Sequence, residues 1–124
     1  MAASSATLHE DPIRLGPEAV DRHRATVSIM EELEAADWYD QRALATGDPE
    51  LQAILTHNRD EEKEHAAMLL EWLRRHDGAL SDHLKTYLFG QGPIHEPVVE
   101  PTPEVSAPNG DGSLYIGSLR GDSR

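Results

Sequence analysis

The sequence predicts an all-α protein: an antiparallel hairpin of two long helices and a short C-terminal helix, with two such chains pairing into a four-helix bundle. Apolar residues recur at helical spacing on both sides of a Gly47-Asp48-Pro49 turn, which predicts the hairpin. Two helices alone cannot bury both apolar stripes, and large exposed apolar patches normally mark interfaces. Pairing of two hairpins into a four-helix bundle would cover these stripes.

The first long helix is expected to run from Pro17 to Thr46. Proline suits the first helical turn, and Glu18 complements the positive end of the helix dipole. Gly47 is a natural residue to follow the helix C-terminus. The apolar positions of this helix are Val20, Val27, Met30, Leu33 and Ala36. Residues 1–15 are predicted to form a flexible N-terminal arm.

The second long helix is expected to begin at Pro49, with Asp48 as its N-cap, and to end near Asp77, where Gly78 follows. One stripe of this helix mixes apolar and polar residues. Its members are Leu51, Ile54, Leu55, Asn58, Glu62, His65, Leu69 and Trp72. The polar members of an otherwise apolar stripe are candidates for a functional site.

The remaining sequence divides into a short helix and a linker. The helix is predicted from Ser81, as its N-cap, to Phe89, with Gly90 as its stop. Residues 16–90 then form one helical domain. Five of the eight prolines lie in residues 91–112, and this stretch is predicted to be a Pro-rich disordered linker.

Composition narrows the functional classes. The net charge is -12, from 23 acidic and 11 basic residues, which argues against nucleic acid as a partner and suits a protein that attracts cations. The absence of cysteine excludes thiolate sites and disulfides, and the cytoplasm is the expected location. No apolar stretch approaches the roughly 20 residues of a transmembrane helix, so no membrane partner is expected.

A Glu-x-x-His pair is the main chemical signal. Glu62 and His65 lie three residues apart, so both side chains belong to one helix face. In an antiparallel hairpin Glu32 lies about as far before the turn as these residues lie after it. The three side chains are therefore expected to converge. An isolated Glu-x-x-His pair is more often a solvated surface feature, but here the pair lies within an apolar stripe.

One chain supplies only half of a familiar metal centre. Di-iron bundles of the ferritin-like type take a Glu from each of two helices and a Glu-x-x-His from each of the other two. This chain has one of each, so two copies related by a two-fold axis complete the set. The predicted fold is accordingly a ferritin-like four-helix bundle with two iron ions at the dimer interface. Carboxylates and imidazoles suit iron.

Further acidic residues surround this pattern. Residues 31–40 hold five acids and no base. This face is either an entry path for Fe²⁺ or a solvated acidic surface, and the spacing favours neither. Tyr39 either adjoins the metal centre or packs as an ordinary aromatic residue.

The sequence resembles the encapsulated ferritins, short ferritin-like proteins housed in encapsulin shells. The resemblance covers nearly the whole chain and is densest in MEELEAADWY at residues 30–39, HNRDEEKEHA at 57–66 and TYLF at 86–89. It implies that Glu32, Glu62 and His65 bind a di-iron centre between two chains, with Tyr39 close by. It also implies that the dimers associate into an annular decamer, which leaves mineral storage to the shell.

The resemblance assigns two further groups of residues. An entry site is expected at Glu31, Glu34 and Trp38. A secondary cation site, for which Ca²⁺ is a candidate, is expected at His57, Glu61 and Glu64. Residues 113–124 resemble an encapsulin cargo-loading peptide, in which the docking residues are Leu114, Ile116, Gly117, Leu119 and Arg120. The location implied is cytoplasmic, inside an encapsulin nanocompartment.

The predicted function is that of a ferroxidase, an enzyme that oxidises Fe²⁺ to Fe³⁺ with dioxygen and feeds iron for mineral storage in the shell. Two alternatives stay open: a metal-stabilised oligomer that holds Zn²⁺, Mn²⁺ or Ca²⁺ without turnover, and a metal-free adaptor that links cargo to a shell.

Overall fold

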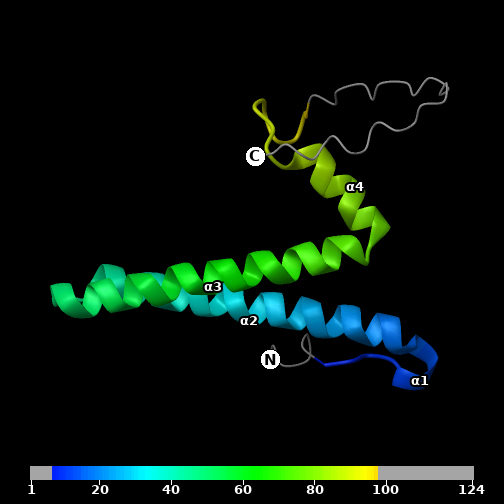
Figure 1. Ribbon diagram of the computed structural model, residues 1–124, viewed down its shortest axis with the longest axis horizontal. Helices are drawn as coiled ribbons and strands as arrows, with labels where there is room; N and C mark the ends of the chain where they lie inside the picture. Colours follow the sequence, from blue (N-terminus) through cyan, green and yellow to red (C-terminus); the bar gives the residue numbers. More distant parts are fainter. Residues whose placement is uncertain (1–6, 98–124) are drawn as a thin grey trace, which may run out of the picture. The chain divides into compact units, whose positions relative to one another are not determined.

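A computed structural model describes residues 7–97, which contain four helices and no strand. Two long helices form a hairpin in which α2 (Pro17–Ala45) and α3 (Pro49–Arg75) lie side by side and antiparallel (Figure 1). At 1.5 Å per residue each is about 40 Å long. The all-α prediction and the antiparallel hairpin are confirmed.

The turn between the long helices follows the predicted capping with one difference. The Asp48 carboxylate accepts hydrogen bonds from the backbone N–H groups of Glu50 and Leu51, at 3.0 and 3.4 Å. Thr46 ends α2 in an extended conformation, and its hydroxyl accepts the N–H of Asp48 at 3.2 Å. Gly47 does not adopt the left-handed conformation expected after a helix, because Thr46 and Asp48 together make the turn.

The predicted start of the short helix was wrong. Helix α4 (Gly78–Tyr87) begins three residues before Ser81, because the Asp77 carboxylate caps it by accepting the N–H of Leu80 at 3.0 Å. The Ser81 hydroxyl instead accepts a hydrogen bond from Arg74 of α3, at 3.0 Å. At the other end of α4, Leu88 is the C-cap, and Phe89 after it adopts the left-handed backbone conformation (φ 63°). Gly90, the predicted stop, does not adopt that conformation.

The N-terminal segment contains a helical turn that was not predicted. Within residues 1–15, for which a flexible arm stays a prediction, α1 (Pro12–Leu15) forms one turn. Asp11 caps it by accepting the N–H of Ile13 at 3.0 Å. Gly16 follows with φ 87°, a conformation that favours glycine, and connects α1 to α2.

The hairpin has a thin core. In the described residues the buried ones are all alanines, and these are Ala25, Ala36, Ala43 and Ala66. Small side chains let α2 and α3 approach closely, but they cover little apolar surface. Leu33, Ile54 and Met68 remain 53%, 53% and 59% exposed. The hairpin therefore presents apolar side chains to its surroundings, as expected for one half of a larger bundle.

The chain divides after Phe89 into two units. In the second unit, the described residues end at Pro97, and the Glu96 N–H donates to the Pro93 carbonyl at 3.2 Å in a turn. Most of the predicted linker, 91–112, and all of the predicted docking segment, 113–124, lie outside the described residues. Among residues 7–97, no helix combines the length and apolarity needed to cross a bilayer.

Candidate metal centre

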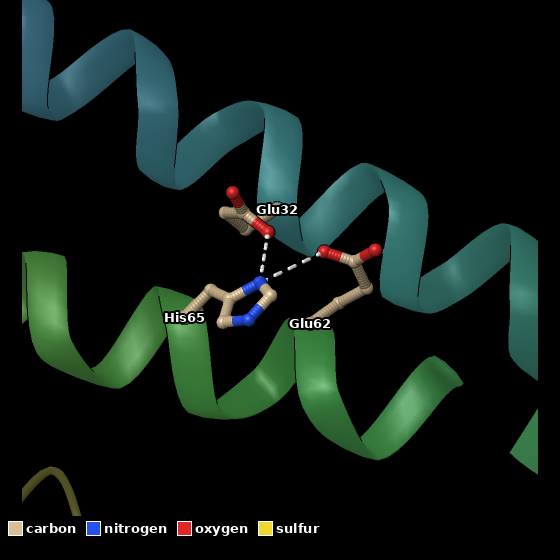
Figure 2. Close-up of side chains that lie close together, drawn as sticks. All are labelled: Glu32, Glu62 and His65. Atoms are coloured by element: carbon tan, nitrogen blue, oxygen red, sulfur yellow. Dashed lines mark hydrogen bonds and ion pairs between the residues drawn. The ribbon is translucent and has the colours of Figure 1, made fainter. Parts of the chain in front are cut away.

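Three potential metal ligands meet across the hairpin. Glu32 comes from α2, whereas Glu62 and His65 come from successive turns of α3 (Figure 2). One ligand atom from each lies within 4.8 Å of the other two. The predicted convergence of these side chains is confirmed, and their binding of metal stays a prediction. Among residues 7–97, Glu32, Glu62 and His65 form the one group of three or more potential metal ligands that lie this close together.

The imidazole of His65 lies between the two carboxylates. Its Nδ1 is 3.2 Å from Glu32 Oε1 and 3.4 Å from Glu62 Oε1. The His65 side chain is 44% exposed, and the side chains of Glu32 and Glu62 are 27% and 23% exposed. This partial burial raises the cost of leaving the two carboxylates charged and unpaired.

Glu62 and His65 bind protons more tightly than free side chains of the same type. A hydrogen bond with Glu32 raises the pKa of Glu62, and partial desolvation adds to this effect. A hydrogen bond with Glu32 also raises the pKa of His65, with a smaller contribution from Glu62. A divalent cation at this position would take over the electrostatic role of those protons.

The donor set is suited to a transition metal but is incomplete for a pair of ions. Two carboxylates and one imidazole are typical ligands of iron, manganese and zinc. A di-iron site of the bundle type takes four carboxylates and two imidazoles, which is twice this set. The partial exposure of all three residues leaves room for a second copy to supply the rest.

Tyr39 forms a cation–π contact with Arg42. The Arg42 guanidinium carbon lies 5.6 Å from the centroid of the Tyr39 ring and 5.9 Å from that of Trp38. Within residues 7–97, no hydrogen bond joins the Tyr39 hydroxyl to Glu32, Glu62 or His65. The placement of Tyr39 beside the iron stays a prediction.

The predicted entry and secondary sites stay predictions. Glu31 and Glu34 are exposed, and Trp38 is 48% exposed. His57 Nε2 lies 3.1 Å from Glu61 Oε2, but Glu64 does not join them in a cluster of three donors. Either site would need a further ligand from water or from another chain.

Sequence reasoning missed a cross-helix ion pair near the three ligands. Arg59 of α3 donates to Asp40 of α2 through one Nη1–Oδ1 contact of 2.9 Å. Comparing distances from the turn would not have found this pair, because Arg59 lies about one helical turn further from the turn than Asp40 does. The long arginine side chain spans the difference. Both residues belong to strongly acidic stretches, where the single arginine was overlooked.

A helical hairpin with two carboxylates and an imidazole meeting across it is typical of the ferritin-like class. A family model described as EncFtn-like matches residues 7–91. This protein belongs to the EncFtn-like family.

Individual relatives agree with this assignment. The encapsulated ferritin-like protein of Rhodospirillum rubrum is 56% identical over 99% of this chain and 94% of its own length. The ferritin-like protein of Thermotoga maritima is 46% identical over 90% of this chain and 96% of its own length. The encapsulin nanocompartment cargo protein EncC of Myxococcus xanthus is 35% identical over 76% of this chain and 80% of its own length.

A solved structure shares the fold. The crystal structure of a Nitrosomonas europaea protein superposes with a TM-score of 0.67 at 59% sequence identity. The match covers 70% of this chain and 96% of that chain.

Proposed function

We propose that this protein is a ferroxidase that oxidises Fe²⁺ with dioxygen at a di-iron centre shared by two chains. The convergence of Glu32, Glu62 and His65 within 4.8 Å carries this proposal. Membership of a ferritin-like family supports iron as the metal. Carboxylate and imidazole ligands suit both oxidation states of iron and leave positions open for oxygen.

Pairing of two chains completes the centre. A two-fold axis beside the three ligands doubles them to four carboxylates and two imidazoles. The exposed Leu33, Ile54 and Met68 supply apolar surface for such an interface. Two iron ions then bind per dimer interface, and the dimers assemble further, with an annular decamer as the expected form.

In the proposed reaction, Fe²⁺ is the substrate. It reaches the centre past the entry residues Glu31, Glu34 and Trp38, while His57, Glu61 and Glu64 hold further cations such as Ca²⁺. Metal binding competes with protonation of Glu62 and His65, whose pKa values are raised. Each Fe²⁺ then gives one electron to dioxygen, and the carboxylates stabilise the higher charge of Fe³⁺. His65 fixes the position of the metal, and Tyr39 lies close to the centre.

The oxidised iron is proposed to be stored as mineral inside an encapsulin shell. Two Myxococcus xanthus relatives are named encapsulin nanocompartment cargo proteins, which supports a shell as partner. The docking segment of this chain is proposed to be residues 113–124, with contacts from Leu114, Ile116, Gly117, Leu119 and Arg120. The location is then the cytoplasm, within the nanocompartment.

The test is the rate of oxygen-dependent Fe²⁺ oxidation by Glu32→Ala, Glu62→Ala and His65→Ala variants. Each is expected to lose at least about 100-fold in rate, because a di-metal site tolerates few missing ligands. Glu50→Gln, an exposed carboxylate of α3, is the control and should match the wild type. Wild-type rates in all three ligand variants would refute the proposal.

Two other outcomes would favour the alternatives. Tight Fe²⁺ binding without oxygen uptake would favour the metal-stabilised oligomer. An assembly that forms without metal would favour the adaptor.

A further inference from the structure

Arg59 forms an ion pair that bridges the two long helices beside the candidate metal centre. Its Nη1 donates to Asp40 Oδ1 of α2 and its Nε to Asp60 Oδ1 of α3, both at 2.9 Å. The Arg59 side chain is only 22% exposed. Within the described residues, the only other ion pair between α2 and α3 is the contact of His65 with Glu32.

The alanine contacts between α2 and α3 do little to fix how the helices align. Interlocking large side chains set the alignment in many helix pairs. Here the buried residues of the pair are Ala25, Ala36, Ala43 and Ala66. These small side chains interlock less deeply than large ones, so packing of the buried residues contributes less to the alignment. Directional polar contacts then take a larger share, and setting the register is the best-attested role of buried polar and ionic groups. Asp40 is 42% exposed, so its pair with Arg59 is only partly buried.

Three side-chain hydrogen bonds join α2 to α3 within residues 7–97, at increasing distance from the turn. Nearest the turn, Gln52 donates to the Ala43 carbonyl, nine residues away in the sequence. Arg59 then donates to Asp40, 19 residues away, and His65 contacts Glu32, 33 residues away. The Arg59 pair lies between the turn and the metal ligands. Arg59 is one helical turn from Glu62, about 4.5 Å along the axis.

We propose that Arg59, through its bridge to Asp40, is a positioning residue that sets the alignment of α3 against α2 and so brings Glu62 and His65 level with Glu32. This inference rests on the proposed metal centre. A slide of a single residue moves α3 by about 1.5 Å. Ligand sets must be held to about 0.5 Å, so that slide is enough to disrupt the cluster.

Charge alone predicts the opposite effect of removing Arg59. The guanidinium is a cation near the centre, so its loss should strengthen the binding of another cation. Loss of positioning should weaken that binding, because only the aligned fraction of molecules offers all ligands. The sign of the change therefore separates the two roles.

The experiment measures binding of Co²⁺, monitored by its visible absorption, to the assembled full-length protein. Arg59→Gln and Asp40→Asn are each expected to weaken binding about three- to tenfold. Asp60→Asn is the matched control: it removes a carboxylate at the same distance from Arg59 but no bridge between helices. It should change affinity less than about twofold.

Unchanged or tighter Co²⁺ binding by Arg59→Gln and Asp40→Asn would overturn the positioning role, as would an equal loss in Asp60→Asn. If Arg59→Gln fails to fold, as judged by circular dichroism, the comparison of Asp40→Asn with Asp60→Asn decides, because both variants remove one carboxylate but only Asp40→Asn removes the bridge between helices. His65→Ala is measured alongside. If His65→Ala binds Co²⁺ as the wild type does, both the proposed metal centre and this inference are refuted. If His65→Ala loses binding while Arg59→Gln and Asp40→Asn do not, only this inference is refuted.

Discussion

His65 Nδ1 lies 3.2 Å from Glu32 Oε1, although the two residues are 33 positions apart in the sequence. The contact joins the middle of α2 to the middle of α3, and Glu62 lies against the same imidazole (Figure 2). The hairpin thus gathers two carboxylates and an imidazole at one height. Since a di-iron site of the bundle type takes twice this donor set, the proposed chemistry depends on assembly.

Metal binding should weaken as the pH falls. Hydrogen bonds with Glu32 raise the pKa values of both Glu62 and His65, so protons compete with the cation over a higher pH range than for free side chains. Below the raised pKa of His65, Co²⁺ affinity should fall about tenfold per pH unit for each proton displaced. Titrations between about pH 8 and about pH 5 check this. His65→Ala should flatten the dependence, and an equally steep dependence in that variant would contradict the assignment.

Assembly should depend on the exposed apolar side chains of the hairpin. Ile54 is 53% exposed and belongs to the α3 stripe that carries Glu62. Ile54→Asp should reduce the mass measured by light scattering and lower Fe²⁺ oxidation with it, since full burial of such a side chain contributes about 1.5–3 kcal/mol. Ile13→Asp is the control, because Ile13 is 88% exposed and lies on α1, outside the hairpin. Intact assembly of the Ile54 variant would place the interface elsewhere.

The C-terminal end of α3 should show a specific response to acid. Hydrogen bonds from Arg74, and then from Arg75, lower the pKa of Glu71 from 4.5 to about 2. A lowered pKa stabilises the fold above the unfolded value, and this contribution disappears as the pH falls through the folded value. Glu71→Gln should therefore lower the thermal midpoint above about pH 4.5 and converge with the wild type near pH 2. Glu71 is 43% exposed, so the difference should be modest and shrink in high salt. A difference independent of pH would show that the ion pairs are not its source.

Delivery to a shell should depend on the C-terminal segment. Deleting residues 113–124 should leave Fe²⁺ oxidation unchanged, since the proposed ligands lie in α2 and α3. The same deletion should abolish co-purification with a co-expressed encapsulin shell protein. Deleting residues 1–6 serves as the control for truncation. Continued encapsulation of the C-terminal deletion would move the docking segment elsewhere.

The errors in the predicted helix ends arose because residue type alone does not decide which of several neighbouring residues ends a helix. Sequence reasoning assigned the cap of the short helix to Ser81, whereas Asp77 caps it and Ser81 accepts from Arg74. Both residues are good N-caps by type, and only the path of the chain after Arg75 decides between them. Similarly, Gly90 is the better residue for a left-handed position, yet Phe89 adopts it. Local propensity ranks such candidates but does not choose among neighbours.

By itself the sequence determined the two long helices, the turn at Asp48 and the pairing of Glu62 with His65 on one helix face, because periodicity, capping and i, i+3 spacing act within one helix. Only the tertiary structure decided that His65 faces both carboxylates, that the buried residues among those described are all alanines, and that Arg59 reaches Asp40. These features depend on the rotation and height of one helix against the other. They are set by many weak contacts at once, which no single stretch of sequence contains.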